Sequence, residues 1–150
     1  DRTLDLTRKL VPPPELCRYV RNYLDERRLV TTILDVTKPS YIELSLKVTL
    51  IRRTVGQSER LRTEIEQRLR RYLHPLVGGK DGKGWPFGRP LFRSDLVHVV
   101  EDVPGVEAID SVQIYDEDRR IMVESVKLKA DELPHIVKVA VIERVRQEMV

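Results

Sequence analysis

The side chains best suited to acid–base or metal chemistry are three histidines, and they lie far apart in the sequence. His74, His98 and His135 have no second histidine or cysteine at the spacing with which a helix or turn holds a metal ion. Cys17 is the single cysteine and flanks an apolar helical stripe, where a small hydrophobic role is expected. We therefore predict structural roles for these residues, with no metal site and no bound cofactor.

A catalytic nucleophile is also not apparent. Ser94 lacks the G-x-S-x-G elbow that exposes a reactive serine. Asp116, Glu117 and Asp118 can hold a cation in principle, but the glycine and spaced oxygens of a calcium loop are missing. The three carboxylates are expected at a solvated hairpin tip, and we predict no catalytic residue.

Glycines cluster between the two halves of the chain in a stretch that resembles a phosphate-binding loop in composition. A Walker loop requires Ser or Thr after Gly82-Lys83, where this chain has Gly84, and its first glycine is replaced by Val77. The dinucleotide fingerprint fails at Phe87, which takes the place of its third glycine. Neither kind of nucleotide site is predicted.

The same loop contains the single tryptophan, Trp85, and one of two phenylalanines, Phe87. Two roles are open. The two rings can form a plug that folds the loop over the sheet, or they can anchor a partner, since tryptophan and arginine are enriched at interface hot spots.

The amino-acid composition favours a folded protein over a disordered or membrane-inserted one. The 150 residues are 41% hydrophobic and 34% charged with a net charge of +3, which is typical of a folded chain rather than a disordered one. Apolar runs are far shorter than the roughly 20 residues that span a bilayer, so no membrane insertion is predicted. The chain begins at Asp1 without methionine, and we expect it to be a piece of a longer protein.

Charge is unevenly distributed along the chain. Residues 1–75 hold 16 Lys/Arg and 10 Asp/Glu, whereas residues 76–150 hold 11 and 14, so the halves differ in sign. Arginines on the predicted helix 57–73 are a hint of nucleic-acid binding. Interleaved glutamates and the missing RNA-stacking motif favour an ion-pair surface instead, and nucleic-acid binding stays the alternative. The arginines are Arg60, Arg62, Arg68, Arg70 and Arg71.

Hydrophobic periodicity predicts the elements of the first half. An opening stretch covers about residues 4–10, a double proline starts an amphipathic helix that runs to about Arg28, and β-branched residues 30–36 indicate a strand. Strict alternation predicts a strand over 41–50, and helical spacing predicts a helix over 57–73 with Ser58 as its cap.

The second half predicts shorter elements. Ser94 is expected to cap a helix, Pro104-Gly105 to turn the chain into a strand at 106–115, and residues 116–120 to form a hairpin turn before a strand at 121–128. Residues 135–145 fit both a helix and a strand, and their β-branched content favours a strand.

This order predicts an α+β fold, specifically a ferredoxin-like split β-α-β two-layer sandwich with an appended small α/β unit. The predicted division is a sandwich subdomain at 1–75, a Gly/Pro/aromatic connecting loop at 76–93 and a small helix-plus-strands subdomain at 94–150. Such sandwiches serve many functions, so the fold does not decide among them.

The run from Leu69 to Arg89, L-x-x-Y-L-H-P-L-x-G-G-x-D-G-x-G-W-P-F-G-R, resembles the C-terminal region of baseplate J-like proteins. Ser94-Asp95-Leu96, Val103-Pro104-Gly105-Val106, Pro39-Ser40-Tyr41 and Asp131-Glu132-Leu133-Pro134 are similar as well, so that the likeness covers about residues 12–143. The loop and assembly motif comprises His74, Pro75, Leu76, Gly78, Gly79, Asp81, Gly82, Gly84, Trp85, Pro86, Phe87, Gly88 and Arg89.

The resemblance implies a non-enzymatic wedge component of the baseplate of a contractile phage tail or injection system. Such subunits contact other wedge subunits, the hub and spike, the inner tube and the sheath, and relay the trigger for contraction. Assembly in a bacterial or archaeal cytoplasm would be expected, as part of a particle that is later released or docked at a membrane.

The uneven charge suggests how copies could meet. The basic half of one copy can face the acidic half of the next in a head-to-tail contact that closes a ring. The candidate interface charges are Arg60, Arg68, Arg71, Asp116 and Asp118.

Overall fold

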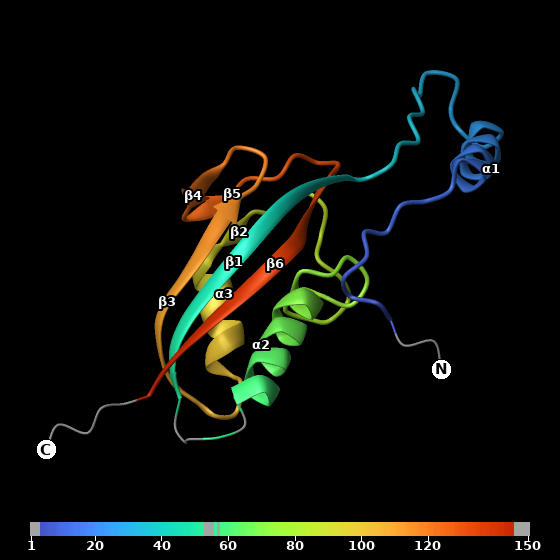
Figure 1. Ribbon diagram of the computed structural model, residues 1–150. Coiled ribbons are helices and arrows are strands. Elements are labelled where there is room, and N and C mark those ends of the chain that lie inside the picture. Colours follow the sequence, from blue (N-terminus) through green and yellow to red (C-terminus); the bar gives the residue numbers. More distant parts are fainter. Residues whose placement is uncertain (1–3, 53–55, 57, 146–150) are drawn as a thin grey trace, which may run out of the picture.

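The computed structural model describes residues 4–52, 56 and 58–145, and it has two layers, a mixed sheet and a pair of helices (Figure 1). The four-stranded sheet has the order β4-β3-β1-β6, in which β1 runs antiparallel to β3 and parallel to β6. Strands β2 and β5 form a separate two-stranded sheet. The elements in chain order are α1 (Pro14–Asp25), β1 (Ser40–Arg52), α2 (Ser58–Tyr72), β2 (Leu91–Phe92), α3 (Arg93–Glu101), β3 (Val106–Asp116), β4 (Ile121–Val123), β5 (Ser125–Val126) and β6 (Glu132–Val145).

Strand β1 is the centre of the fold and confirms the alternating pattern of the sequence. Leu44, Leu46, Val48 and Leu50 are all buried, because successive side chains of a strand point to opposite faces and these four share the face that the helices cover. Their partners on β3 include Ile114, opposite Leu46, which is also fully buried.

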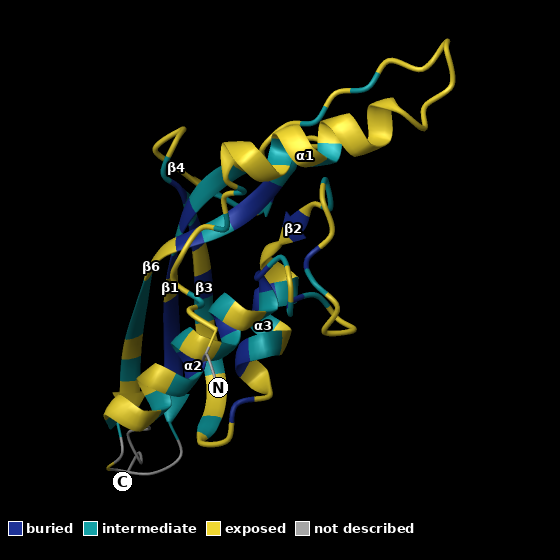
Figure 2. Ribbon diagram, turned by 90° about the vertical axis from the view of Figure 1, so that its right-hand side faces the viewer, coloured by how far each residue is buried: buried dark blue, intermediate teal, exposed yellow. Residues whose placement is uncertain are grey.

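Helices α2 and α3 lie on the same face of the sheet, as Figure 2 shows from the helix side. Ile65 and Leu69 of α2 point inward, as their helical spacing predicted. The partly buried flanks of α2 carry the two expected ion pairs, Glu64–Arg68 at 2.7 Å and Glu66–Arg70 at 3.1 Å.

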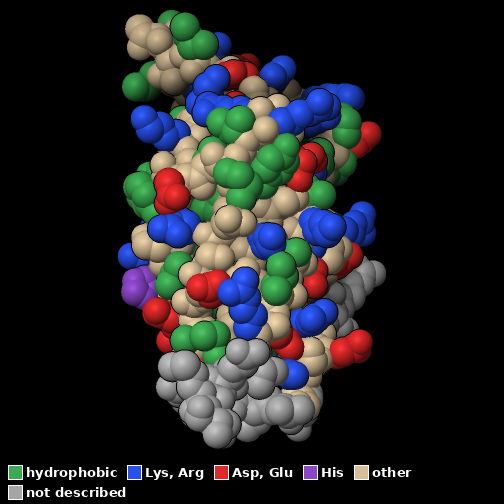
Figure 3. Space-filling view, turned by 60° about the vertical axis from the view of Figure 1, so that its left-hand side comes forward, with side chains coloured by type: hydrophobic (Ala, Val, Ile, Leu, Met, Phe, Trp, Pro, Cys, Tyr) green, Lys and Arg blue, Asp and Glu red, His purple; other side chains and the backbone are tan. Residues whose placement is uncertain are grey.

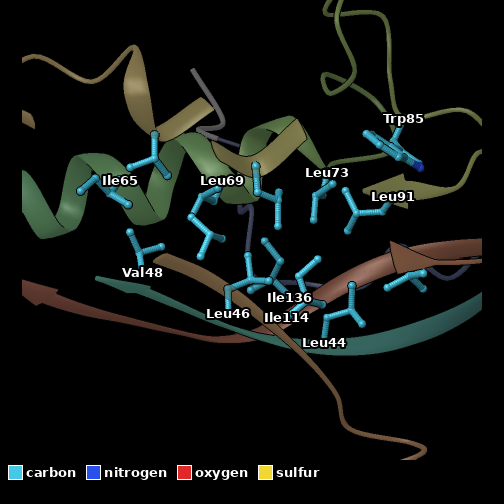
Figure 4. Packing of buried hydrophobic residues seen from close by; sticks show 14 of the residues in the cluster. Leu44, Leu46, Val48, Ile65, Leu69, Leu73, Trp85, Leu91, Ile114 and Ile136 are labelled. Atoms are coloured by element: carbon cyan, nitrogen blue, oxygen red, sulfur yellow. The ribbon is translucent and has the colours of Figure 1, made fainter. Parts of the chain in front are cut away.

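One hydrophobic cluster joins both halves of the sequence. Leu44 and Ile65 come from the first half, Leu96, Ile114 and Ile136 come from the second, and all belong to the same core (Figure 4). Segments 1–75 and 94–150, predicted as two subdomains, therefore contribute strands to a single sheet and side chains to a single core.

The α+β class is confirmed, as are the helix that begins after Pro13, the strand at 106–115, the turn at 116–120 and the choice of strand at 135–145. One predicted strand is wrong, because residues 30–36 form a turn and an irregular segment in which Val30 is 97% and Ile33 is 96% exposed. The opening stretch 4–10 contains no strand either. A segment with strand propensity forms a strand only when another strand pairs with it, and no strand of the sheet pairs with either of these segments. The ferredoxin-like strand order, which needed both of them, is not confirmed.

Two local predictions are also corrected. Helix α3 begins at Arg93 rather than after Ser94, and its first turn is closed by the Asp95 carboxylate, which accepts the Phe92 N–H at 3.1 Å. The predicted strand 121–128 is interrupted at Glu124, where the chain passes from β4 in the large sheet to β5 in the small one. Ser58 begins α2, and its hydroxyl donates to Glu143 at 2.7 Å.

The charge difference between the halves of the sequence does not separate two halves of the molecule. Strand β1 of the first half lies between β3 and β6 of the second half. On the face in Figure 3, Lys and Arg side chains are interspersed with Asp and Glu. Because strands of the two halves alternate in the sheet, positive and negative side chains lie side by side on that face.

Candidate functional site

The glycine-rich loop is closed by its own backbone. The His74 carbonyl accepts the N–H groups of Gly78 (2.8 Å) and Trp85 (3.0 Å), which brings the two ends of the loop together. Gly79 N–H donates to Tyr72 O at 2.8 Å, and Gly84 N–H donates to Gly78 O at 2.9 Å. The N–H groups of Gly78, Gly79, Gly84 and Trp85 are thus bonded to backbone carbonyls of the protein itself.

Two glycines make this closure sterically possible. A Cβ on Gly78 would lie 2.3 Å from Tyr72 O, and a Cβ on Gly84 would lie 2.2 Å from Pro75 O. Gly84 also has a φ of +115°, which side-chain-bearing residues rarely adopt. Gly78 and Gly84 are therefore required by the loop's own packing.

The two aromatic residues of the loop have different places. Trp85 is 2% exposed, contacts Tyr72 edge-to-face with ring centroids 5.5 Å apart, and donates Nε1–H to Arg89 O at 3.3 Å. Figure 4 shows it beside Leu91 at the end of the core. Phe87 is 56% exposed. The plug interpretation therefore describes Trp85, and only Phe87 is available to a partner.

An open hollow of about 1100 Å³ lies between α2, α3 and the loop. Tyr72, Val77 and Val99 supply its apolar lining, and charges of both signs surround them. The mixture suits a polar protein surface better than a small anion. The charged lining residues are Arg68, Arg71, Lys80, Asp81, Asp95 and Asp102.

The predicted interface charges do not all reach solvent. Arg60, Arg71 and Asp118 are exposed, but Arg68 is held by Glu64 and also donates to Asp102 O at 3.2 Å. Asp116 is buried. Asp116 is therefore removed from the set of possible intermolecular contacts, because its carboxylate stabilises the hairpin turn instead.

Substituting Asp116→Ala is expected to destabilise the fold by roughly 1–3 kcal/mol, because its carboxylate oxygen Oδ1 accepts the N–H groups of Asp118 and Arg119, each at 3.0 Å. Asp118→Ala, at an exposed position of the same turn, is the matched control and is expected to change stability by at most about 0.5 kcal/mol. Urea denaturation of both variants measures the difference. Equal stability would contradict the assigned role of Asp116.

Helix α1 forms an arm that projects from the body of the molecule (Figures 1 and 2). None of its twelve residues is buried. An isolated helix shorter than about 12–15 residues is only marginally stable in water, so an amphipathic helix of this length gains most of its stability from packing. The arm as a whole comprises residues 11–39, and the large hydrophobic side chains that it exposes are Val11, Leu16, Tyr19, Tyr23, Leu24, Leu29, Val30 and Ile33.

Both ends of the arm are fastened at one place, which we call the neck. The Tyr41 hydroxyl at the start of β1 donates to Leu10 O at 2.5 Å, and Lys9 forms an ion pair with Glu43. Residues 11–39 therefore leave the body and return to it at the same point. The direction of the arm is set at the neck, which sequence analysis did not identify.

Two other clusters join residues that are distant in sequence. His74 and His135, predicted as isolated, line one small cavity beside the neck. At the opposite end of β1, the Glu143 carboxylate lies 3.5 Å from Arg52 and 3.6 Å from Arg62. The sequence does not indicate this cluster, because strand register decides which charged residues near the end of β1 lie next to one another.

Among the described residues, no group of three or more His, Cys, Asp or Glu side chains is placed to hold a metal ion. Every helix in the described part of the chain is too short or too polar to cross a lipid bilayer. Comparison with models of known protein families and with curated proteins found no match to this chain.

Proposed function

We propose that this chain is a structural assembly module, a wedge component of the baseplate of a contractile tail or contractile injection system. The observation that carries the assembly role is the arm, in which no residue of α1 is buried and several large hydrophobic side chains are exposed. Contiguous exposed apolar surface is typical of protein–protein contact sites. The baseplate identity rests on the motif from Leu69 to Arg89.

The body of the protein supplies a rigid base for the arm. The loop fixes the end of α2 through Trp85, and the neck fastens the arm beside that end, since Leu73, His74 and Pro75 line the same cavity as Leu6 and Leu10. We infer that the loop motif keeps the base rigid, while the arm contacts a neighbouring wedge subunit. Phe87 and Leu76, both exposed on the loop, offer a second, smaller contact.

A nucleic-acid-binding role has less support. Arg68 and Arg70 pair with glutamates of their own helix, and Arg70 also donates to Ile136 O at 2.7 Å. Paired arginines release fewer counterions from a phosphate backbone. Oligonucleotide binding that falls steeply with salt would favour this alternative over assembly, and an enzymatic role is not proposed.

Replacing Tyr19 and Ile33 together with glutamate is expected to abolish incorporation into the particle, because two exposed anchors of the arm become charged. We expect affinity for the neighbouring subunit to fall by at least about 100-fold and thermal stability of the isolated chain to stay unchanged. Electron microscopy of particles purified through a tag on this chain, from cells that produce the whole assembly, measures ring formation.

The control is Met122→Glu, which introduces a glutamate at an exposed hydrophobic side chain of β4, outside the arm. This variant should assemble normally. If the arm variant enters rings as well as the control does, the arm is not an assembly surface.

A further inference from the structure

The N-terminal segment, residues 4–10, is held on the body by side chains rather than by strand pairing. Its fastening consists of the Tyr41–Leu10 hydrogen bond and the Lys9–Glu43 ion pair, together with the apolar contact of Leu6. Both polar contacts are at least partly exposed. A modest change in local charge can therefore shift this segment between docked and released states.

Beneath the segment lies a cavity of about 20 Å³, which is lined by the segment itself, by Tyr41, by the end of α2 with the residues that follow it, and by the start of β6. His135 of β6 is half-buried there and contacts the Tyr41 ring edge-to-face at 6.0 Å. His74 is buried, and its Nδ1 accepts the Leu76 N–H at 3.1 Å, so its neutral form carries the proton on Nε2. The cavity thus has two histidines behind the segment that fastens the arm.

The charges around these rings are mainly positive. Burial lowers the pKa of His135 below its ordinary value, and Lys9 and Arg70 lower it further, while Glu43 opposes them. Burial and the nearby Arg71 lower the pKa of His74. Arg8 also lines the cavity, and Glu66 pairs with Arg70 from the solvent side.

The neighbouring carboxylates and the phenol keep their charge state in mild acid. The Lys9 ammonium holds the pKa of Glu43 below its usual range, and a hydrogen bond from Thr7 does the same for Asp5. Burial raises the pKa of Tyr41, which therefore remains a hydrogen-bond donor. Of these groups, only the histidines have an ordinary pKa in the range of mild acid.

We propose that the neck is a pH-sensitive latch, in which protonation of His135 repels Lys9 and Arg70, releases residues 4–10 from the body and frees the arm to reorient. This inference rests on the proposed role of the arm and adds its regulation. His135 is the sensor, because release of residues 4–10 exposes its ring to water and moves Lys9 away from it. His74 is less suited, since protonation at Nδ1 would set a donor against the Leu76 N–H.

The direction in which pH changes docking follows from the linkage between proton binding by His135 and release of residues 4–10. A histidine with a lower pKa in the docked state than in the released state binds more protons after release. Docking is therefore fully stable above the pKa of the released histidine, about 6.5, and weakens as the pH falls below it.

One tryptophan and one cysteine allow a direct test on the complete, partner-free chain. Energy transfer from Trp85 in the core to an acceptor dye on Cys17 of α1 reports the position of the arm. We expect wild-type transfer to change sigmoidally between about pH 7.5 and pH 5, with a midpoint below about 6.5. His135→Gln and His135→Asn, each checked for folding by circular dichroism, should show no such transition.

Two controls separate the latch from a general effect of acid. His98→Gln removes an exposed histidine away from the neck and should keep the wild-type transition. Tyr41→Phe cannot donate to Leu10 O and should show transfer shifted toward its acid value already at neutral pH. Flat wild-type transfer, a transition that persists in both His135 variants, or a Tyr41→Phe profile equal to wild type would overturn the latch.

The transfer measurement involves no partner, whereas incorporation of the arm variant into rings tests assembly. A chain without the transition whose arm variant still fails to assemble would refute only the latch. A chain with the transition whose arm variant assembles normally would refute only the assembly role.

Discussion

Gly84→Ala is expected to destabilise the protein by roughly 3–5 kcal/mol, since it combines backbone strain with a clash. The added Cβ would meet Pro75 O at 2.2 Å and Pro75 C at 3.0 Å, and both are backbone atoms that cannot rotate away. The φ of +115° adds strain for any residue with a side chain. Domains of this size have about 5–15 kcal/mol of stability, so thermal unfolding should begin well below the wild-type temperature.

Gly82→Ala is the matched control in the same loop. Its φ of +71° is also positive, but the nearest neighbour of an added Cβ would be Val77 O at 4.0 Å. The cost should be only about 1–2 kcal/mol, from the left-handed backbone alone. Differential scanning calorimetry of the two variants compares them, and equal melting temperatures would show that the loop does not close as described.

Trp85→Ala is expected to reduce the free energy of unfolding by roughly 3–5 kcal/mol. The ring is almost fully buried, packs edge-to-face on Tyr72 and lies under Arg89, whose guanidinium is 5.2 Å from the ring centroid. Its removal leaves a cavity between the loop and the end of α2. Chemical denaturation followed by circular dichroism gives the measurement, since the variant has no tryptophan signal.

Phe87→Ala, two residues away and exposed, should change stability by at most about 0.5 kcal/mol. Any effect of Phe87→Ala should appear in particle assembly rather than in folding. An unchanged melting temperature for Trp85→Ala would mean that the loop is not anchored by this ring.

Elements with strong local periodicity were predictable from the sequence. The alternation in β1 and the helical spacing in α2 each state which side chains face inward, since side-chain direction repeats every two residues in a strand and every 3.6 in a helix. Residues 30–36 show that local residue preference alone does not decide the structure of a segment. They have strand propensity, yet Val30 and Ile33 are exposed in the arm because no strand lies beside them.

In the glycine-rich loop, too, some properties could be predicted from the sequence and others could not. Its glycines and aromatic residues marked it as unusual, and its departure from nucleotide-binding motifs could be predicted from spacing. Which aromatic ring is buried could not. Trp85 faces the core and Phe87 faces solvent because the His74 carbonyl fixes the direction of the returning chain.

By itself, the sequence determined the α+β class, the main helices and strands, and the chemical character of the loop, since these depend on residues close together in the chain. Only the tertiary structure decided that β1 lies between β3 and β6, that Asp116 is buried, and that His135 meets Lys9 and His74 at the neck. Such contacts join residues dozens of positions apart. Their energy depends on strand register and helix packing, which no local pattern of residues specifies.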